Sequence, residues 1–395
     1  MMTEKIYYED VYCKTFEAEV VSCRSGKKGY EIVLDRTAFY PEGGGQPGDT
    51  GMLFVAGTEE KVSVLDTREK NEEIWHVAEK PIEPGCKVRG EIDWENRFDL
   101  MQNHSGEHIV SGLIHQAFGY QNVGFHMGKD VITIDFDGEI TEEQMEEIEK
   151  KANAVVWANR PVEIVFYTEE EVKEVEYRSK KELHGMVRIV TFPGADVCAC
   201  CGTHVERTGE IGLIKLISVQ KHKEGVRMEM LSGRKAFEYV LGICKQNQQI
   251  SVALSAKPTE TAAAVDRTKE AMLSAQYRAV AMELKVFDAV AKEMTGAGDV
   301  VLFEDQLSAD GVRKLAVQVM ETCGGRCIVL SGNEDEGYKY AMGQTGGDLR
   351  EFVKSFNKTL NGRGGGKPFF AQGSVLAKRT EIEKFLKENG IEEKV

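Results

Sequence analysis

The chain has 395 residues, 42% of them hydrophobic and 29% charged, which is typical of a soluble globular protein with about two to four domains. Its apolar runs are shorter than the ~20 residues of a membrane span, and its nine cysteines favour reduced thiols in a cytoplasm over a disulfide framework. The net charge of −15 argues against nucleic-acid binding through overall charge, so any such contact must be local.

Residues 1–92 are predicted to form a small β-barrel, because short apolar or alternating runs are broken repeatedly by Gly, Pro and Asp turns. Between two of these runs lies Gly43-Gly44-Gly45-Gln46. Consecutive glycines let a backbone approach a ligand closely and expose its N–H groups, and the Gln46 amide can both donate and accept hydrogen bonds. The segment therefore predicts a binding loop, with a Gly-rich hairpin turn as the structural alternative.

Residues 93–232 indicate an α+β domain. A helix is predicted from about Arg97 to Phe118, where Gly119 ends it, and Thr141 with Gln144 forms a capping box at the start of a second helix. The predicted strands cover residues 131–136, 162–167, 187–192, 211–220 and 226–231.

Two pairs of residues in this domain have the spacing of metal ligands. His104 and His108 are four residues apart and lie on one face of the predicted helix. Cys200 and His204 repeat that spacing on a predicted loop between two strands. One thiolate and three imidazoles suit tetrahedral zinc, so the sequence predicts a Zn2+ site.

The same residues allow a second interpretation. His104 to His108 reads H-x-x-E-H, the inverted zincin pattern of some metallopeptidases, in which Glu107 would be the general base. That pattern needs a distant carboxylate as the third ligand, and the Cys200–His204 run competes for this role. The sequence alone leaves the peptidase open.

Residues 233–295 are predicted to form a helical hairpin, and residues 296–395 a small α/β domain. The longer helix has a coiled-coil-like seam that makes a homodimer plausible, through these helices or through the C-terminal domain. The seam residues are Leu273, Tyr277, Val280, Leu284, Phe287, Ala291 and Met294. Near the C terminus, the Gly-rich run 362–368 is predicted to be a loop that carries Arg363 and Lys367 and can wrap a phosphate backbone, although it lacks P-loop spacing.

In this order, the motifs resemble a known family. Tyr40–Gln46, His104-x-x-x-His108 and Cys200-x-Gly202-Thr203-His204 are similar to the editing half of alanyl-tRNA synthetase, and the run 362–368 resembles its C-terminal DHHA1 domain. Too few residues precede the first motif for an adenylating fold. The chain therefore resembles the free-standing AlaX-type editing proteins in their longer form.

The resemblance implies a trans-acting hydrolase that cleaves the ester of mischarged alanine tRNA, charged with serine or glycine. It implies zinc ligands at His104, His108, Cys200 and His204, catalytic or sensing roles for Thr37 and Gln46, and tRNA contacts by Arg363, Gly364, Gly365, Gly366 and Lys367. The backbone N–H groups of the Gly43–Gly45 loop, with Gly44 and Gly45 as catalytic candidates, are expected to hold the ester oxygen. The basic clusters 178–181 and 221–227 are expected to join the tRNA-binding face.

One departure from the family separates the alternatives. The synthetase usually has H-T-A-T-H where this chain has H-S-G-E-H, so Glu107 is unusual and is expected to face away from the metal. Besides the hydrolase and the peptidase, a tRNA-binding protein with a purely structural zinc remains a third possibility.

Overall fold

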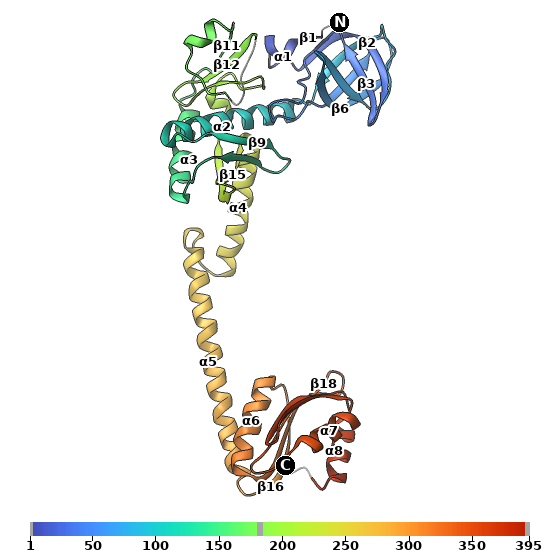
Figure 1. Ribbon diagram of the computed structural model, residues 1–395, viewed down its shortest axis with the longest axis vertical. Coiled ribbons are helices and arrows are strands. Elements are labelled where there is room, and N and C mark those ends of the chain that lie inside the picture. Colours follow the sequence, from blue (N-terminus) through green and yellow to red (C-terminus); the bar gives the residue numbers. More distant parts are fainter. Residues whose placement is uncertain (1–2, 180–184, 392–395) are drawn as a thin grey trace. The chain divides into compact units, whose positions relative to one another are not determined.

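A closed six-stranded barrel forms the N-terminal part of the protein in the computed structural model, as predicted (Figure 1). In barrel order its strands are β2 (Thr15–Gly26), β3 (Gly29–Leu34), β7 (Glu73–Ala78), β6 (Lys61–Lys70), β5 (Gly51–Val55) and β8 (Lys87–Ile92). Beside the barrel, β1 (Glu4–Lys5) pairs in parallel with β4 (Arg36–Thr37), and the short helix α1 (Ile6–Glu9) follows β1. The structure describes residues 3–179 and 185–391.

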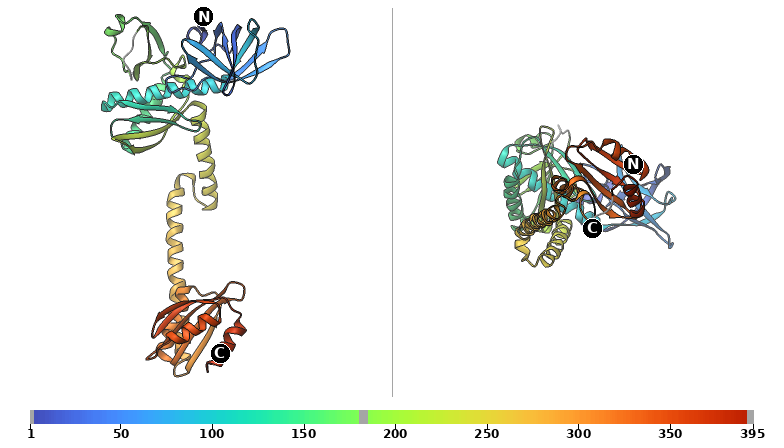
Figure 2. Two further views of the ribbon diagram at one scale, coloured as in Figure 1. Left: turned by 45° about the vertical axis from the view of Figure 1, so that its right-hand side comes forward. Right: turned by 90° about the horizontal axis from the view of Figure 1, so that it is seen from below.

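Helix α2 (Trp94–Phe118) is the central element of the next part. It begins three residues before the predicted start, because the Asp93 side chain accepts a hydrogen bond from the Asn96 N–H and caps it. It ends at Gly119 in the left-handed conformation, as expected. Figure 2 shows α2 running between two β-sheets, which explains why most of its residues are buried.

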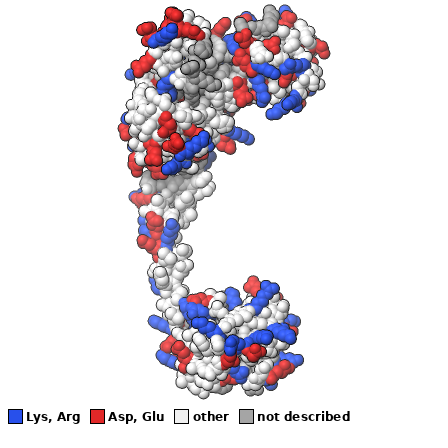
Figure 3. All heavy atoms as spheres, viewed as in Figure 1, with Lys and Arg blue, Asp and Glu red and all other residues white. Residues whose placement is uncertain are grey.

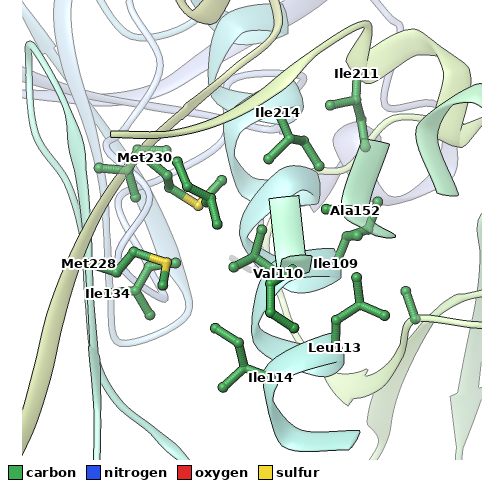
Figure 4. Close-up of a cluster of buried hydrophobic side chains, with 14 of the residues drawn as sticks. Ile109, Val110, Leu113, Ile114, Ile134, Ala152, Ile211, Ile214, Met228 and Met230 are labelled. Carbon is green, nitrogen blue, oxygen red and sulfur yellow. The ribbon is translucent and has the colours of Figure 1, made fainter. Parts of the chain in front are cut away.

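The larger sheet has the order β14-β15-β10-β9 and packs on α2 together with α3. Its core contacts join Ile109, Val110 and Ile114 of α2 to Ile134, Met228 and Met230 of the sheet (Figure 4). The elements are β9 (Asn122–Met127), β10 (Ile132–Phe136), β14 (Ile214–His222), β15 (Gly225–Ser232) and α3 (Glu142–Trp157), which carries the predicted capping box.

The smaller sheet contains β11 (Glu163–Tyr167), β12 (Val187–Phe192) and β13 (Asp196–Ala199) in that order, with the 3-10 turns Glu171–Glu174 and Thr208–Ile211 nearby. The sequence did not predict β9 or β13. Segment 122–127 has a glycine and no clean alternation, and β13 is only four residues long.

The chain divides into two compact units, Met1–Gln248 and Gln249–Val395. Helix α4 (Gly233–Ala253) spans the boundary, and the 3-10 turn Pro258–Glu260 and α5 (Thr261–Glu293) follow it. The predicted seam of α5 is buried only in its second half. Phe287 and Ala291 join the core around α6, whereas Tyr277 is 75% exposed.

The second unit contains a five-stranded sheet with the order β16-β17-β18-β20-β19. Its elements are β16 (Gly298–Glu304), α6 (Ala309–Thr322), β17 (Gly324–Asn333), β18 (Gly337–Gln344), α7 (Arg350–Thr359), β19 (Gly362–Lys367), β20 (Phe370–Val375) and α8 (Arg379–Glu388). In the described part of the chain, none of the helices is both long and apolar enough to cross a membrane.

The glycine run near the C terminus differs from the prediction, because it is the edge strand β19 and not a loop. The side chain of Tyr340 on β18 crosses the sheet here and donates a hydrogen bond to Asn357 of α7. A Cβ atom would lie 2.5 Å from the Tyr340 hydroxyl at Gly364 and 2.7 Å from it at Gly373. The glycines therefore make room for Tyr340.

A buried histidine makes the stability of the barrel pH-dependent. Burial lowers the pKa of His76 to about 4 in the folded protein, whereas an unfolded chain has a His pKa of about 6.5. As the pH falls from about 6.5 towards 4, the unfolded state takes up a proton that the folded state does not. The free energy of unfolding should therefore fall on acidification, by up to about 3 kcal/mol from this group.

Denaturant titrations from pH 7 to pH 4, followed by tryptophan fluorescence, measure this slope. The His76→Gln variant should lose the corresponding part of the slope, whereas the exposed His126→Gln control should keep it. Equal slopes for the parent and His76→Gln would contradict the assignment.

Candidate metal centre

The structure brings the four predicted ligand residues together. His104 and His108 are buried on α2, and Cys200 and His204 lie on the loop that follows β13. One ligand atom from each residue lies within 4.8 Å of the others. His104 and Cys200 are in direct contact, although they are 96 positions apart in the chain.

The distances between donor atoms fit tetrahedral coordination. The Cys200 sulfur is 3.5 Å from His104 Nε2 and 3.4 Å from His204 Nε2. Zinc–sulfur and zinc–nitrogen bonds at the tetrahedral angle separate the two donor atoms by about 3.6 Å. These two pairs of donor atoms are therefore spaced as a tetrahedral ion requires, and the four ligand atoms all lie within 4.8 Å of one another.

The three imidazoles each have a polar partner at Nδ1, and for His104 and His108 this partner is an acceptor. His104 Nδ1 lies 2.9 Å from Gln46 Oε1, His108 Nδ1 lies 2.9 Å from Asp196 Oδ2, and His204 Nδ1 lies 3.5 Å from Ser105 Oγ. An acceptor at Nδ1 selects the tautomer that carries its proton there and leaves the Nε2 lone pair for a metal. Arg178 holds Asp196 through two hydrogen bonds of 2.8 and 2.9 Å.

The charges of the cluster also favour metal binding. Burial alone would raise the pKa of Cys200, but the imidazoles of His104, His204 and His108 outweigh burial and lower this pKa well below its ordinary value. Burial lowers the pKa of His204 well below its ordinary value. The thiolate of Cys200 and the neutral imidazole of His204 are the forms that bind metal. Burial alone would lower the pKa of His108, but Cys200 and Asp196 outweigh burial and raise this pKa well above its ordinary value. A metal ion must therefore displace a proton from His108.

The glycine loop is a tight turn beside this cluster. Gly43 and Gln46 exchange two backbone hydrogen bonds of 3.0 Å, and Gly44 and Gly45 both have positive φ, as in a type I′ turn. Within the described residues, no hydrogen bond uses the N–H of Gly44 or Gly45, and both residues are exposed. These two N–H groups are available to a ligand.

Gln46 connects three parts of the site. It is fully buried; its Oε1 accepts from His104 and from the Thr203 N–H, and its Nε2 donates to the Thr203 hydroxyl. Both ends of its amide are therefore occupied by protein groups. In this geometry Gln46 positions a ligand histidine.

Thr37 is buried in the barrel and bound to His76. His76 Nδ1 lies 3.0 Å from the Ile32 carbonyl and must donate to it, so Nε2 accepts the Thr37 hydroxyl proton at 2.8 Å. The Thr37 oxygen also accepts from the Phe39 N–H. One lone pair of the hydroxyl is left for another donor.

Glu107 is held by a separate set of partners. Its Oε1 accepts hydrogen bonds from the Ser111 hydroxyl at 2.6 Å and from the Asn122 amide at 2.5 Å. The side chain is buried.

The expected basic face is only partly present in the first unit. Arg178 is paired with Asp196 and its side chain is 14% exposed, and Arg227 is paired with Asp135, so neither is an uncompensated cation. Lys180 and Lys181 lie outside the described residues. Arg363 and Lys367 lie on the exposed edge strand β19.

Sequence patterns did not reveal the outer partners Asp196, Thr203 and Ser105 or the ion pair between Arg97 and Asp49. The sequence offered only their positions as a signal: Asp196 precedes the cysteine motif, Thr203 lies within it, and Ser105 follows the first histidine.

Comparison with known families agrees with this arrangement. The family of class II (A) tRNA synthetases matches residues 2–96, the second additional domain of threonyl and alanyl tRNA synthetases matches residues 187–227, and the DHHA1 domain matches residues 294–389. The fold and the site are thus of the editing class that is related to alanyl-tRNA synthetase.

Full-length relatives define the family. The chain is 31% identical to the alanyl-tRNA editing protein AlaX-L of Pyrococcus horikoshii, with 96% of each chain covered. It is 28% identical to the alanyl-tRNA editing protein Aarsd1-A of Xenopus laevis, with 95% of each covered. The chain belongs to the family of alanyl-tRNA editing proteins. It is also 33% identical to the alanine–tRNA ligase of Pyrobaculum arsenaticum, of which it covers 42%.

Removal of the Gln46 amide should weaken metal binding. Gln46→Ala leaves His104 Nδ1 and the Thr203 N–H without their acceptor, and loss of such an outer partner typically costs about 10- to 100-fold in metal affinity. Competition with a chromogenic chelator for Zn2+ measures the change. Gln102→Ala is a matched control, since Gln102 is a buried glutamine of α2 that bonds the Glu210 carbonyl. Unchanged affinity in Gln46→Ala would remove Gln46 from the positioning role.

Proposed function

We propose that this protein is a trans-acting aminoacyl-tRNA hydrolase that cleaves the ester of mischarged alanine tRNA. Ser-tRNA(Ala) is the first candidate substrate and Gly-tRNA(Ala) the second. The observation that carries the proposal is the convergence of three imidazoles and a thiol beside the glycine turn, with Gln46 bonded to His104. Membership of the alanyl-tRNA editing family supports it.

The chain's own groups supply what ester hydrolysis needs. An aminoacyl ester is already activated, so the site must hold it, position a water molecule and stabilise the developing oxyanion. The free N–H groups of Gly44 and Gly45 are the candidate oxyanion donors.

His104, His108, Cys200 and His204 would hold a zinc ion. With one position open to substrate or water, bound zinc would orient the substrate or lower the pKa of a water molecule; with all four ligands attached it can only organise the site. Gln46 and Asp196 accept from Nδ1 and keep His104 and His108 in the metal-binding tautomer, while the Ser105 hydroxyl lies beside Nδ1 of His204.

Selectivity needs a group that pairs with the extra hydroxyl of serine. A pocket with such a partner rejects alanine, because alanine leaves the partner unpaired. Thr37 is the candidate, and the remaining lone pair of its hydroxyl would accept the serine proton.

The C-terminal unit is the proposed tRNA-binding part. Arg363 and Lys367 of β19 would contact tRNA phosphates, with Gly364, Gly365 and Gly366 between them. Lys and Arg side chains are prominent on the visible face of this unit (Figure 3). The exposed half of the α5 seam, including Leu273, Tyr277 and Val280, would support a homodimer.

The two alternative functions are less well supported. An inverted zincin needs Glu107 beside the metal, but Glu107 Oε1 is bonded to Ser111 and Asn122, and the third and fourth donors are Cys200 and His204. The non-catalytic alternative leaves the open N–H groups of the glycine turn without a role.

Deacylation of Ser-, Gly- and Ala-tRNA(Ala), measured side by side, tests the proposal. Ser-tRNA(Ala) should be hydrolysed and Ala-tRNA(Ala) spared. Thr37→Val removes the proposed hydrogen bond to the serine hydroxyl together with the hydrogen bonds to His76 and from the Phe39 N–H. Loss of the bond to serine should lower kcat/KM for Ser-tRNA(Ala) about tenfold while tRNA affinity is unchanged. Thr208→Val, a buried threonine outside the site, is the control. Zinc and tRNA bound without any hydrolysis would favour the non-catalytic alternative.

Glu107→Gln separates the hydrolase from the peptidase. The amide oxygen of glutamine can still accept from Ser111 and Asn122, so deacylation should stay within a few-fold of the parent. A general base cannot be replaced by an amide, so a peptidase would lose nearly all activity. Loss of all hydrolysis in this variant would count against the proposed function.

A further inference from the structure

An exposed apolar edge lies next to the ligand loop. β11 is the outer strand of the smaller sheet, and Ile164 and Phe166 on one of its faces are 39% and 45% exposed. Phe166 lies opposite Arg188 of β12 in the strand register. The Phe166 ring also contacts the ring of Tyr8, on α1, with 6.1 Å between the centroids.

This edge is tied directly to the metal-ligand loop. Arg188 Nη1 donates to the Cys200 carbonyl at 2.6 Å, and the Tyr8 hydroxyl donates to the Cys201 carbonyl at 3.1 Å. The Arg188 guanidinium lies 5.4 Å from the centre of the Tyr8 ring. Figure 1 shows α1 between the sheet of β11 and the barrel.

The other aromatic rings at the cluster are less accessible. Phe192 packs on His108 and is fully buried, and Tyr40 is 3% exposed. Phe125 covers His104 and is only partly exposed. Phe166 combines a flat apolar ring, high exposure and a neighbouring guanidinium, which are the features that hold unpaired bases by stacking.

The proposed tRNA substrate carries an unpaired base at its 3′ end, close to the ester. The ester that the site would cleave is attached to the terminal ribose, so the terminal base must lie within one nucleotide of the cluster. We infer that Phe166, flanked by Tyr8 and Ile164, stacks an unpaired base at the 3′ end of the RNA substrate. The inference rests on the proposed function and extends it to a binding site.

Two variants and a control test this site. Phe166→Leu keeps an apolar side chain but removes the aromatic face, and Phe166→Trp restores a larger face. Val165→Ala is the control, because Val165 is 42% exposed on the opposite face of the same strand. Two assays are needed: steady-state deacylation of Ser-tRNA(Ala) over a range of tRNA concentrations, and fluorescence anisotropy with a single-stranded RNA that ends in CCA, the 3′ terminus of tRNA.

Phe166→Leu should raise KM and weaken binding of the RNA about tenfold each, as loss of one base stack does. Its kcat at saturating tRNA and its zinc content should equal those of the parent, which a general structural defect would not allow. Phe166→Trp should restore both values, and Val165→Ala should match the parent.

Equal RNA binding by the parent and Phe166→Leu overturns the inference, as does equal weakening by Val165→Ala. A change in sedimentation of Phe166→Leu with unchanged RNA binding assigns the edge to a protein contact and also overturns it. If the parent hydrolyses no charged alanine tRNA, the proposed function fails by itself, and RNA binding alone decides whether Phe166 stacks a base.

Discussion

A buried ion pair between Arg97 and Asp49 fixes the barrel against the ligand helix. Arg97 lies in the first turn of α2 and is fully buried. It donates to the Asp49 carboxylate and the Ala38 carbonyl, while Asp49 also accepts from the Tyr40 N–H. The bonds thus clamp both ends of the segment that contains the glycine turn. Because desolvation offsets much of the attraction in such a pair, its contribution lies in geometry, whereas loss of one partner leaves a costly buried charge. The position of Gln46 beside His104 depends on this clamp.

Local patterns in the sequence predicted much of the fold and the ligand set. The barrel strands alternate with clear turns, and Gly119 marks the end of the helix that carries His104 and His108. The capping Asp93 was missed, so the predicted start of this helix was three residues late. The His and Cys pairs were recognisable because a spacing of four residues is a local property. Helices and turns bring together residues that are close in the chain, and the periodicity of the sequence predicts such local contacts well.

Contacts between distant segments were outside the reach of that reasoning. Asp196 is 88 residues from His108, and Gln46 is 58 residues from His104 and 157 from Thr203, so no spacing rule connects them. The prediction that the C-terminal glycine run is a loop was wrong for another reason. Glycine-rich composition is typical of loops, and only the path of Tyr340 across Gly364 and Gly373 explains why a strand has these residues.

The outer partners also link metal binding to assembly of the site. His104 takes its partner from the barrel turn, His108 from β13, and His204 from the neighbouring Ser105 on α2. A metal that binds the oriented imidazoles more tightly than free ones must stabilise the contacts that orient them by the same free energy, since linkage is reciprocal. Binding at the cluster therefore strengthens the attachment of the barrel to α2, and this attachment places the glycine turn beside the imidazoles. Metal binding and the placement of the candidate oxyanion donors beside the imidazoles are in this way thermodynamically coupled.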